Sequence, residues 1–135
     1  MVNGEKSGLW GFAYLDLARM EIVKGKGYEE GDQRLRYLAA MYKRAGIPVV
    51  IDSQVERFPP HFPMGENVIF YFGWYVFHSD GPFREGDFRF KKGAVAAHLH
   101  SFSATTLRST TDYWVGPLLH RGAAAVLGTV HEPFL

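Results

Sequence analysis

The sequence predicts an α/β fold in which a mostly parallel sheet is covered on both faces, giving three α/β/α layers. Short apolar segments, which fit buried strands, alternate along the chain with an amphipathic helix and turn-rich connections. Several of these segments end at a polar residue, at the edge of a parallel sheet where ligands bind. We therefore expect residues 1–135 to form a single α/β domain that is part of a longer domain and whose sheet is incomplete.

The first half of the chain is expected to contain two strands joined by a helix. Leu9–Leu15 is an apolar and aromatic segment, typical of a strand, that ends at Asp16. Asp32–Arg44 carries apolar residues at spacings of three and four with charged residues between them, which predicts an amphipathic helix. Ile47–Ile51, rich in β-branched residues, predicts a second strand that ends at Asp52.

The second half of the chain is expected to contain three more strands. These strands cover Val68–Phe72, Gly93–His98 and Ala123–Leu127. A short helix over Tyr113–Arg121 connects the last two. The segment Trp74–Lys92 carries turn signals, so we expect an excursion or a small hairpin there that serves as a lid.

Composition excludes several classes of protein. The chain has 135 residues, of which 47% are hydrophobic and 16% aromatic, so it can bury a core. A formal net charge of +1 creates no field that would attract nucleic acid. No apolar run approaches the length of about 20 residues that spans a bilayer, and the N-terminal residues contain no signal-peptide core. We expect a soluble chain without a nucleic-acid partner, whose location stays open.

Two histidines follow the predicted strand Gly93–His98 at the edge of the sheet. His98 and His100 are two residues apart, so alternation along a strand places them on the same side. A carboxylate such as Glu132 or Asp16 would complete a nitrogen and oxygen site for a divalent metal such as zinc, iron or manganese. The alternative is that at least one histidine is hydrogen-bonded within the core and binds no ligand.

Hydroxyl groups beside these histidines suggest a second chemistry. Ser101 or Ser103 would act as a nucleophile, with one histidine as its base and Asp16 or Glu132 as the orienting carboxylate. Ser101 lacks the Gly-x-Ser-x-Gly sequence that exposes a nucleophile in α/β-hydrolases, and a serine after a strand also caps a following helix.

Two further features of the same edge are consistent with ligand binding. The hydroxyls and amides of Ser101–Arg108 would cradle an anion at the start of a helix, or form an ordinary capped turn. In the aromatic stretch Phe70–Phe77 we expect most rings to lie in the core and only Trp74 or Tyr75 to reach the cleft, where they would stack on a sugar or peptide.

Five runs of residues occur in this order along the chain: Phe72–Tyr75, Gly81–Phe83, Gly93–Ala104, Trp114–Leu119 and Gly128–Leu135. Together they resemble an uncharacterised bacterial family whose members occur in genomes that encode exosortase sorting systems. The resemblance covers most positions from Gly8 onward and implies no known reaction. It implies that the family domain is longer than this chain, with further strands.

The order of the predicted elements resembles a second group of proteins more distantly. A strand ending in histidine, followed by a helix and a strand that ends near a small loop, is similar to the scaffold of the caspase and gingipain peptidases. This resemblance implies a caspase-like sheet; a flavodoxin-like sheet is the alternative. Those peptidases carry a cysteine after the later strand, where this chain reads Leu127–Val130 and has no cysteine at all.

Two classes of function follow from these residues. The first is a hydrolase-like enzyme that acts on peptide or glycan substrates through a histidine and carboxylate site. The second is a noncatalytic binding or scaffold module, linked to envelope protein sorting, that holds a partner at the aromatic edge. A bound metal or a perturbed histidine pKa would favour the enzyme, and dry, well-packed histidines would favour the module. An exposed sheet edge would favour a homodimer.

Overall fold

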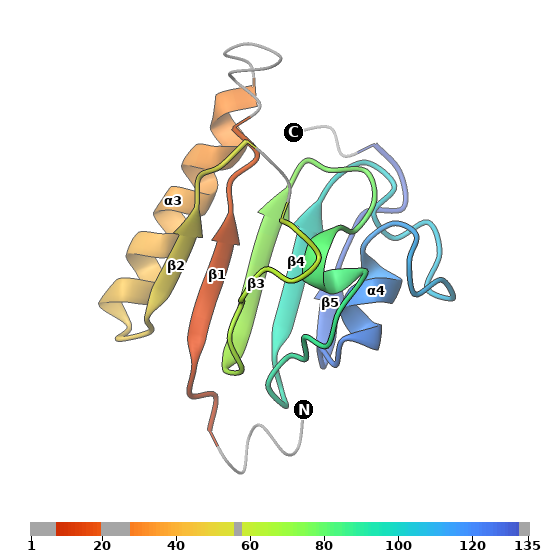
Figure 1. Cartoon of the computed structure of the whole chain (residues 1–135). Coiled ribbons are helices and arrows are strands. Elements are labelled where there is room, and N and C mark those ends of the chain that lie inside the picture. The colour runs from red at the N-terminus through yellow and green to blue at the C-terminus, as the bar shows by residue number, and fades with distance from the viewer. Residues whose placement is uncertain (1–7, 20–27, 56–57, 133–135) are drawn as a thin grey trace.

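A five-stranded sheet forms the centre of the protein, and every pair of neighbouring strands is parallel (Figure 1). The computed structural model describes residues 8–19, 28–55 and 58–132, so the N-terminal residues examined for a signal peptide lie outside it. The strand order is β2-β1-β3-β4-β5. The predicted α/β class with a parallel sheet is confirmed.

The elements follow the predicted segments with shifted ends. The strands are β1 (Phe12–Asp16), β2 (Val49–Asp52), β3 (Val68–Trp74), β4 (Val95–Leu99) and β5 (Ala125–Leu127). The helices within the described residues are α3 (Glu29–Arg44), the single-turn 3-10 helix η2 (Gly81–Phe83) and α4 (Val115–His120). None of the described helices is long and apolar enough to cross a bilayer.

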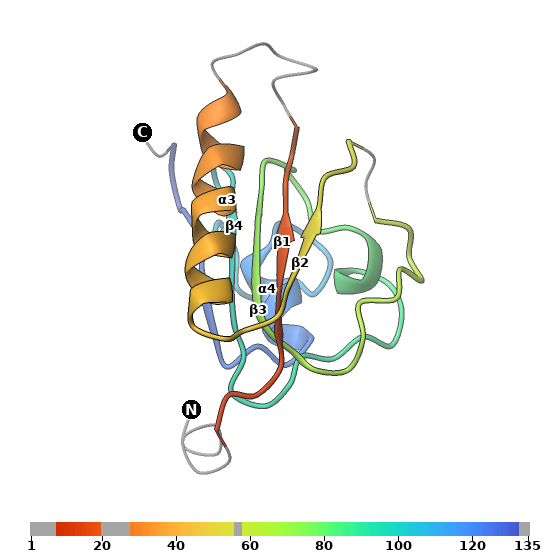
Figure 2. The ribbon, with the colours of Figure 1, turned by 90° about the vertical axis from the view of Figure 1, so that its left-hand side faces the viewer.

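The two faces of the sheet are covered differently. Helix α3 packs on one face, against β1, β2 and β3. Helix α4 lies on the other face together with η2, as the view along the sheet shows (Figure 2). The main hydrophobic core is on this second face, where Tyr71, Phe83, Trp114 and Leu118 are all buried. Alternation along β3 and β4 therefore directs Tyr71 and His98 into this core.

Helix α3 begins before the predicted position. It starts at Glu29 rather than near Asp32, so Asp32 lies in its first turn and is buried. Three acidic residues in that turn and two basic residues in the last turn complement the helix dipole.

The segment Trp74–Lys92 forms the predicted excursion and not the alternative hairpin, and its core contacts do not favour a role as a lid. After β3 ends, this segment forms one turn of 3-10 helix and no strand, and the side chains of Phe83 and Phe90 are buried in the core. The guanidinium of Arg121 donates hydrogen bonds to the carbonyls of Phe83, Arg84 and Gly86, at 3.0, 2.8 and 2.5 Å. Because its aromatic residues are part of the core, the segment cannot swing open without exposing that core.

Candidate functional site

The strand order creates a topological switch point between β1 and β3. The chain leaves β1 for β2 on one side and later forms β3 on the other side of β1, so the connections diverge at the carboxyl ends of these strands. In open parallel sheets of this order, ligands bind in the crevice at that point. Asp16 ends β1 and is half-buried there, and Asp52, which ends β2, is its register partner.

A row of three residues runs across the sheet at this level. Gly73 lies between Asp16 and His98 in the pairing of β1, β3 and β4. Because glycine has no side chain, the hydroxyl of Tyr71 occupies the space: it lies 3.1 Å from Asp16 Oδ2 and 3.3 Å from His98 Nδ1. A Cβ atom on Gly73 would lie 2.5 Å from the Tyr71 hydroxyl oxygen. Glycine is therefore required here for Tyr71 to bridge the other two side chains.

His98 belongs to the core. Its side chain is 1% exposed, and its ring stacks on Trp114 with a centroid distance of 3.5 Å and an interplanar angle of 4°. The Val76 N–H donates to His98 Nε2 at 3.3 Å, so the proton of the neutral ring is assigned to Nδ1. Burial, and then the proximity of His100, hold the pKa of His98 well below its usual value. His98 is therefore neutral, and both of its ring nitrogens have partners.

The hydrogen bonds of this row have one consistent direction. His98 Nδ1–H donates to the Tyr71 hydroxyl oxygen, and the Tyr71 O–H donates to Asp16. Burial raises the pKa of Asp16 to about 7; the Tyr71 hydrogen bond lowers it, and the charges of Asp52 and Asp32 raise it further. Asp16 thus exchanges a proton near neutral pH, which general acid or base catalysis requires.

Asp32 anchors the connection that follows β1. Its carboxylate accepts hydrogen bonds from the N–H groups of Ala18 and Arg19, both at 3.0 Å, and from Trp74 Nε1 at 2.5 Å. The Trp74 ring is consequently buried, whereas Tyr75 is partly exposed. Of Trp74 and Tyr75, one of which was expected to lie outside the core, Tyr75 is the more exposed ring, and Phe77, which is 44% exposed, is a further exposed ring that was not expected.

His100 and Ser101 lie beside Tyr75 and form a separate group. The His100 ring packs against Tyr75 and Phe77, with centroid distances of 4.9 and 5.1 Å. Its Nδ1 lies 2.5 Å from the backbone carbonyl oxygen of Ser101, while the Ser101 side chain is hydrogen-bonded to Tyr75. His100 thus contacts the backbone carbonyl of Ser101, whereas a catalytic base would contact the hydroxyl of the nucleophile.

Ser103 has a structural position. Its side chain is fully buried, and its Oγ accepts a hydrogen bond from the Thr129 N–H at 2.9 Å. Its carbonyl accepts from the N–H groups of Trp114 and Val115. Since α4 begins only at Val115, the turns of residues 101–108 do not lead into a helix, and the predicted anion cradle at a helix start is wrong.

Glu132 is exposed and lies near Tyr75. Burial raises the pKa of Tyr75 most, followed by the neighbouring Tyr28 and then by the charge of Glu132. The structure thus brings Asp16 to His98 through Tyr71, and brings Glu132 toward Tyr75. Within the described ranges, no group of three or more histidine, aspartate or glutamate residues is arranged to hold a metal ion. The metal site predicted from His98, His100 and Glu132 gains no support from this arrangement.

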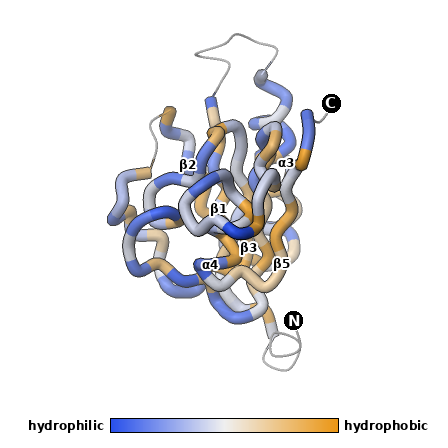
Figure 3. The backbone as a smooth tube through the Cα atoms, turned by 90° about the vertical axis from the view of Figure 1, so that its right-hand side faces the viewer, coloured by the Kyte–Doolittle hydropathy of each residue, from blue (hydrophilic) through white to orange (hydrophobic). Residues whose placement is uncertain are grey.

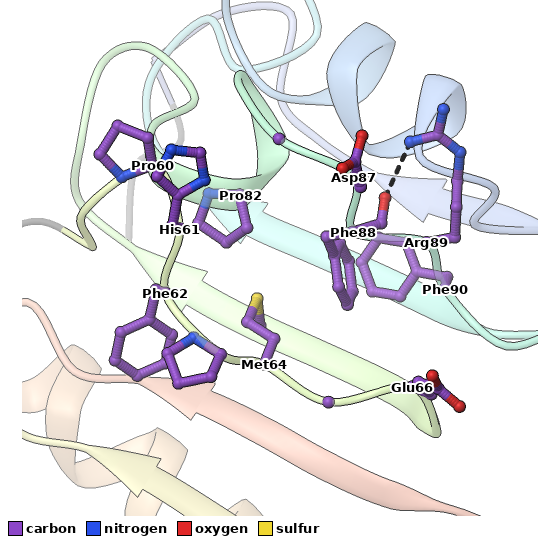
Figure 4. A pocket seen from close by; sticks show the side chains of 13 residues that line it. Pro60, His61, Phe62, Met64, Glu66, Pro82, Asp87, Phe88, Arg89 and Phe90 are labelled. Atoms are coloured by element: carbon purple, nitrogen blue, oxygen red, sulfur yellow. Dashed lines mark hydrogen bonds between the residues drawn. The ribbon is translucent and has the colours of Figure 1, made fainter.

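A pocket of about 580 Å³ lies between the segment before β3 and the segment before β4 (Figure 4). Prolines and phenylalanines dominate its lining, with four ionisable side chains among them: Pro60, His61, Phe62, Pro63, Met64, Gly65, Glu66, Pro82, Gly86, Asp87, Phe88, Arg89 and Phe90. Its volume is in the range of small-ligand pockets. The only sequence signal for it is the cluster of proline and phenylalanine at residues 58–63.

Sequence reasoning also missed two residues of the switch point. Tyr71 reads as one aromatic residue in a buried strand, and Gly73 reads as the end of that strand. Comparison with family models, curated proteins and solved structures finds no match to this chain. The family resemblance described above therefore stays a prediction, and the site must be interpreted from its geometry.

Proposed function

We propose that this domain is a hydrolase-like enzyme whose acid–base chemistry is centred on Asp16 and Asp52. One observation carries the proposal: a half-buried carboxyl group with a pKa of about 7 ends β1 at the switch point and is held by the Tyr71 hydroxyl. A carboxyl group that titrates near neutral pH at the carboxyl end of a parallel strand is a candidate catalytic acid or base. The acid–base role that the sequence suggested for His98 or His100 is therefore proposed for Asp16.

The two carboxyl groups have complementary roles in this proposal. Asp16 and Asp52 are register partners on neighbouring strands, whose backbones lie about 4.8 Å apart. Protonated Asp16 donates its proton to the leaving oxygen or nitrogen as the bond to the substrate breaks. The Asp52 carboxylate accepts a proton from the attacking water, and the two groups exchange protons with solvent before the next turnover. Peptides and glycans are the substrate classes that we propose.

Tyr71 and His98 act as positioning residues. The Tyr71 hydroxyl fixes the orientation of Asp16, and neutral His98 fixes the direction in which that hydroxyl donates. The Val76 N–H and the stacked Trp114 ring in turn hold the His98 ring. Such support from surrounding side chains is what keeps a reacting group in its productive geometry.

The test is a hydrolysis assay with panels of fluorogenic peptides and chromogenic glycosides. We expect Asp16→Asn and Asp52→Asn each to lose activity, and the exposed loop variant Glu85→Gln to keep it. Because protonated Asp16 is the acid, kcat/KM should fall as pH rises through about 7. Tyr71→Phe should move this fall to higher pH, since the hydrogen bond lowers the Asp16 pKa. Activity that survives in Asp16→Asn would contradict the proposal.

A second function is favoured by two other observations. His98 is fully buried and stacked on Trp114, as expected for a noncatalytic module, and the lining of the proline and phenylalanine pocket suits an apolar side chain of a peptide. The resemblance described above would link such a module to envelope protein sorting. In that case a peptide library should yield ligands whose binding is lost in Phe88→Ala and unchanged in Asp16→Asn. Peptide binding that is lost in Asp16→Asn and unchanged in Phe88→Ala would support the enzyme instead.

A further inference from the structure

The proline and phenylalanine pocket is a groove between two connections of the chain. One wall is formed by residues 60–66, which lead from β2 into β3, and the other by residues 86–90, which lead from η2 toward β4. The groove follows β3, with Glu66 beside the start of this strand and His61 toward its carboxyl end (Figure 4). A pocket of about 580 Å³ holds a drug-sized molecule, which corresponds to a few amino-acid residues rather than to one side chain.

The floor and both walls of this groove carry apolar side chains. Figure 3 shows hydrophobic residues along β3 and β5 and hydrophilic residues in many of the connections around them, so these two connections differ from the rest. Met64 and Phe90 are buried in the main hydrophobic core and form the floor. Phe88, whose ring lies 4.9 Å from that of Phe90, and Phe62 on the other wall are both partly exposed. A ligand between Phe62 and Phe88 therefore meets apolar surface on both sides, which favours an apolar side chain.

The hydrogen-bonding groups of the groove suit a peptide better than a glycan. Its described lining contains no serine, threonine, asparagine, glutamine, tyrosine or tryptophan, and only its four ionisable side chains can form hydrogen bonds. Most hydroxyl groups of a bound glycan would therefore lie against apolar surface without partners. Backbone donors are present on both walls, because the N–H groups of Gly65 and Phe88 have no acceptor within the described part of the chain. The carbonyl groups of an extended peptide can accept hydrogen bonds from such donors.

Two carboxylates outnumber the single guanidinium along the groove. Glu66 and Asp87 lie on opposite walls, both are exposed, and neither forms an ion pair with another residue of the described ranges. The guanidinium of Arg89 donates a hydrogen bond to the carbonyl of Phe88 at 2.9 Å. A cationic side chain beside the apolar one would thus meet a carboxylate without an ion-pair partner. Charge complementarity therefore favours a basic peptide over an acidic one.

We propose that this groove binds a short, extended peptide in which one aromatic or long aliphatic side chain is flanked by lysine or arginine. The apolar side chain lies between Phe62 and Phe88. The flanking cations pair with Glu66 and Asp87. This inference rests on the binding function proposed above and names its ligand. It does not depend on hydrolysis at Asp16, which is not part of the groove.

Fluorescence anisotropy with three labelled peptides tests this proposal. The first peptide has a phenylalanine flanked by lysines, the second has the same phenylalanine flanked by glutamates, and the third has an alanine flanked by lysines. We expect the first peptide to bind at least about tenfold more tightly than either of the others, since only it satisfies both the apolar walls and the carboxylates. A labelled oligosaccharide of similar length tests whether the groove takes a glycan instead.

A charge reversal makes the test specific for this groove. Glu66→Lys should weaken binding of the lysine-flanked phenylalanine peptide at least about fivefold and strengthen binding of the glutamate-flanked one. Glu66 is exposed, so this variant should fold. Glu29→Lys is the matched control, because it makes the same change of charge at an exposed position of α3, on the other face of the sheet, and should leave binding intact. Circular dichroism shows whether each variant is folded.

Three results would overturn the proposal: equal binding of the three peptides, equal effects of Glu66→Lys and Glu29→Lys, or an oligosaccharide that binds more tightly than any of the peptides. Peptide binding that is lost in Phe88→Ala but does not depend on the flanking charges would overturn the proposed ligand and leave the binding function in place. If no peptide binds, both the ligand and the binding function are wrong.

Discussion

Replacement of Asp16 by asparagine removes the titration of this carboxyl group and keeps its shape. The pKa of Asp16 rises from 3.8 to about 7 in the folded protein. Because the folded state then binds more protons than the unfolded state between these values, the stability contributed by Asp16 is present at low pH and is lost as pH rises through this window. A shift of about three units corresponds to roughly 4 kcal/mol, an upper value because the side chain is partly exposed.

Asparagine does not titrate, so Asp16→Asn should gain stability relative to the natural protein, by up to about 4 kcal/mol, as pH rises from about 4 to about 8. Urea unfolding followed by tryptophan fluorescence at both pH values measures this difference. His98 has the opposite sign, because its lowered pKa destabilises the fold as pH falls below 6.5, but it is present in both proteins and cancels. A stability difference that does not change with pH would refute this reasoning.

Three other substitutions test the contacts around the site by urea unfolding. Gly73→Ala should cost about 1–3 kcal/mol and should cost less in a Tyr71→Phe background, since the added Cβ meets the Tyr71 hydroxyl; equal costs would contradict this. Asp32→Ala should cost about 3 kcal/mol or more because three donors lose their acceptor; a cost below about 1 kcal/mol would contradict it. Ser103→Ala should cost about 1–2 kcal/mol through the unsatisfied Thr129 N–H, whereas no loss would show that this bond is dispensable.

The sequence was sufficient to predict the fold class because its main signals are local. Val68–Phe72 is a continuous apolar run, and α3 has a clear helical spacing, so both were found with only their ends displaced. The core contacts of the segment Trp74–Lys92 were not predicted because its turn signals report local conformation. The burial of Phe83 and Phe90 depends on contacts with distant residues, which local patterns do not contain.

The site was only partly predictable for the same reason. Asp16 and His98 were recognised because both end strands, where parallel sheets place ligands. Their connection depends on Tyr71 and on the register of three strands across Gly73, which no spacing in the sequence reveals. The sequence also cannot show how deeply a histidine is buried. His98 therefore looked like a ligand or base, although its nitrogens are used within the core.

The most direct test of the central claim is an NMR titration of the Asp16 side-chain carboxyl carbon in the natural protein, assigned by comparison with Asp16→Asn. The proposed acid–base site predicts a midpoint at about 7 and a further rise in Tyr71→Phe, since the Tyr71 hydrogen bond favours the charged carboxylate. A midpoint near the ordinary value of 3.8, with no response to Tyr71→Phe, would contradict it.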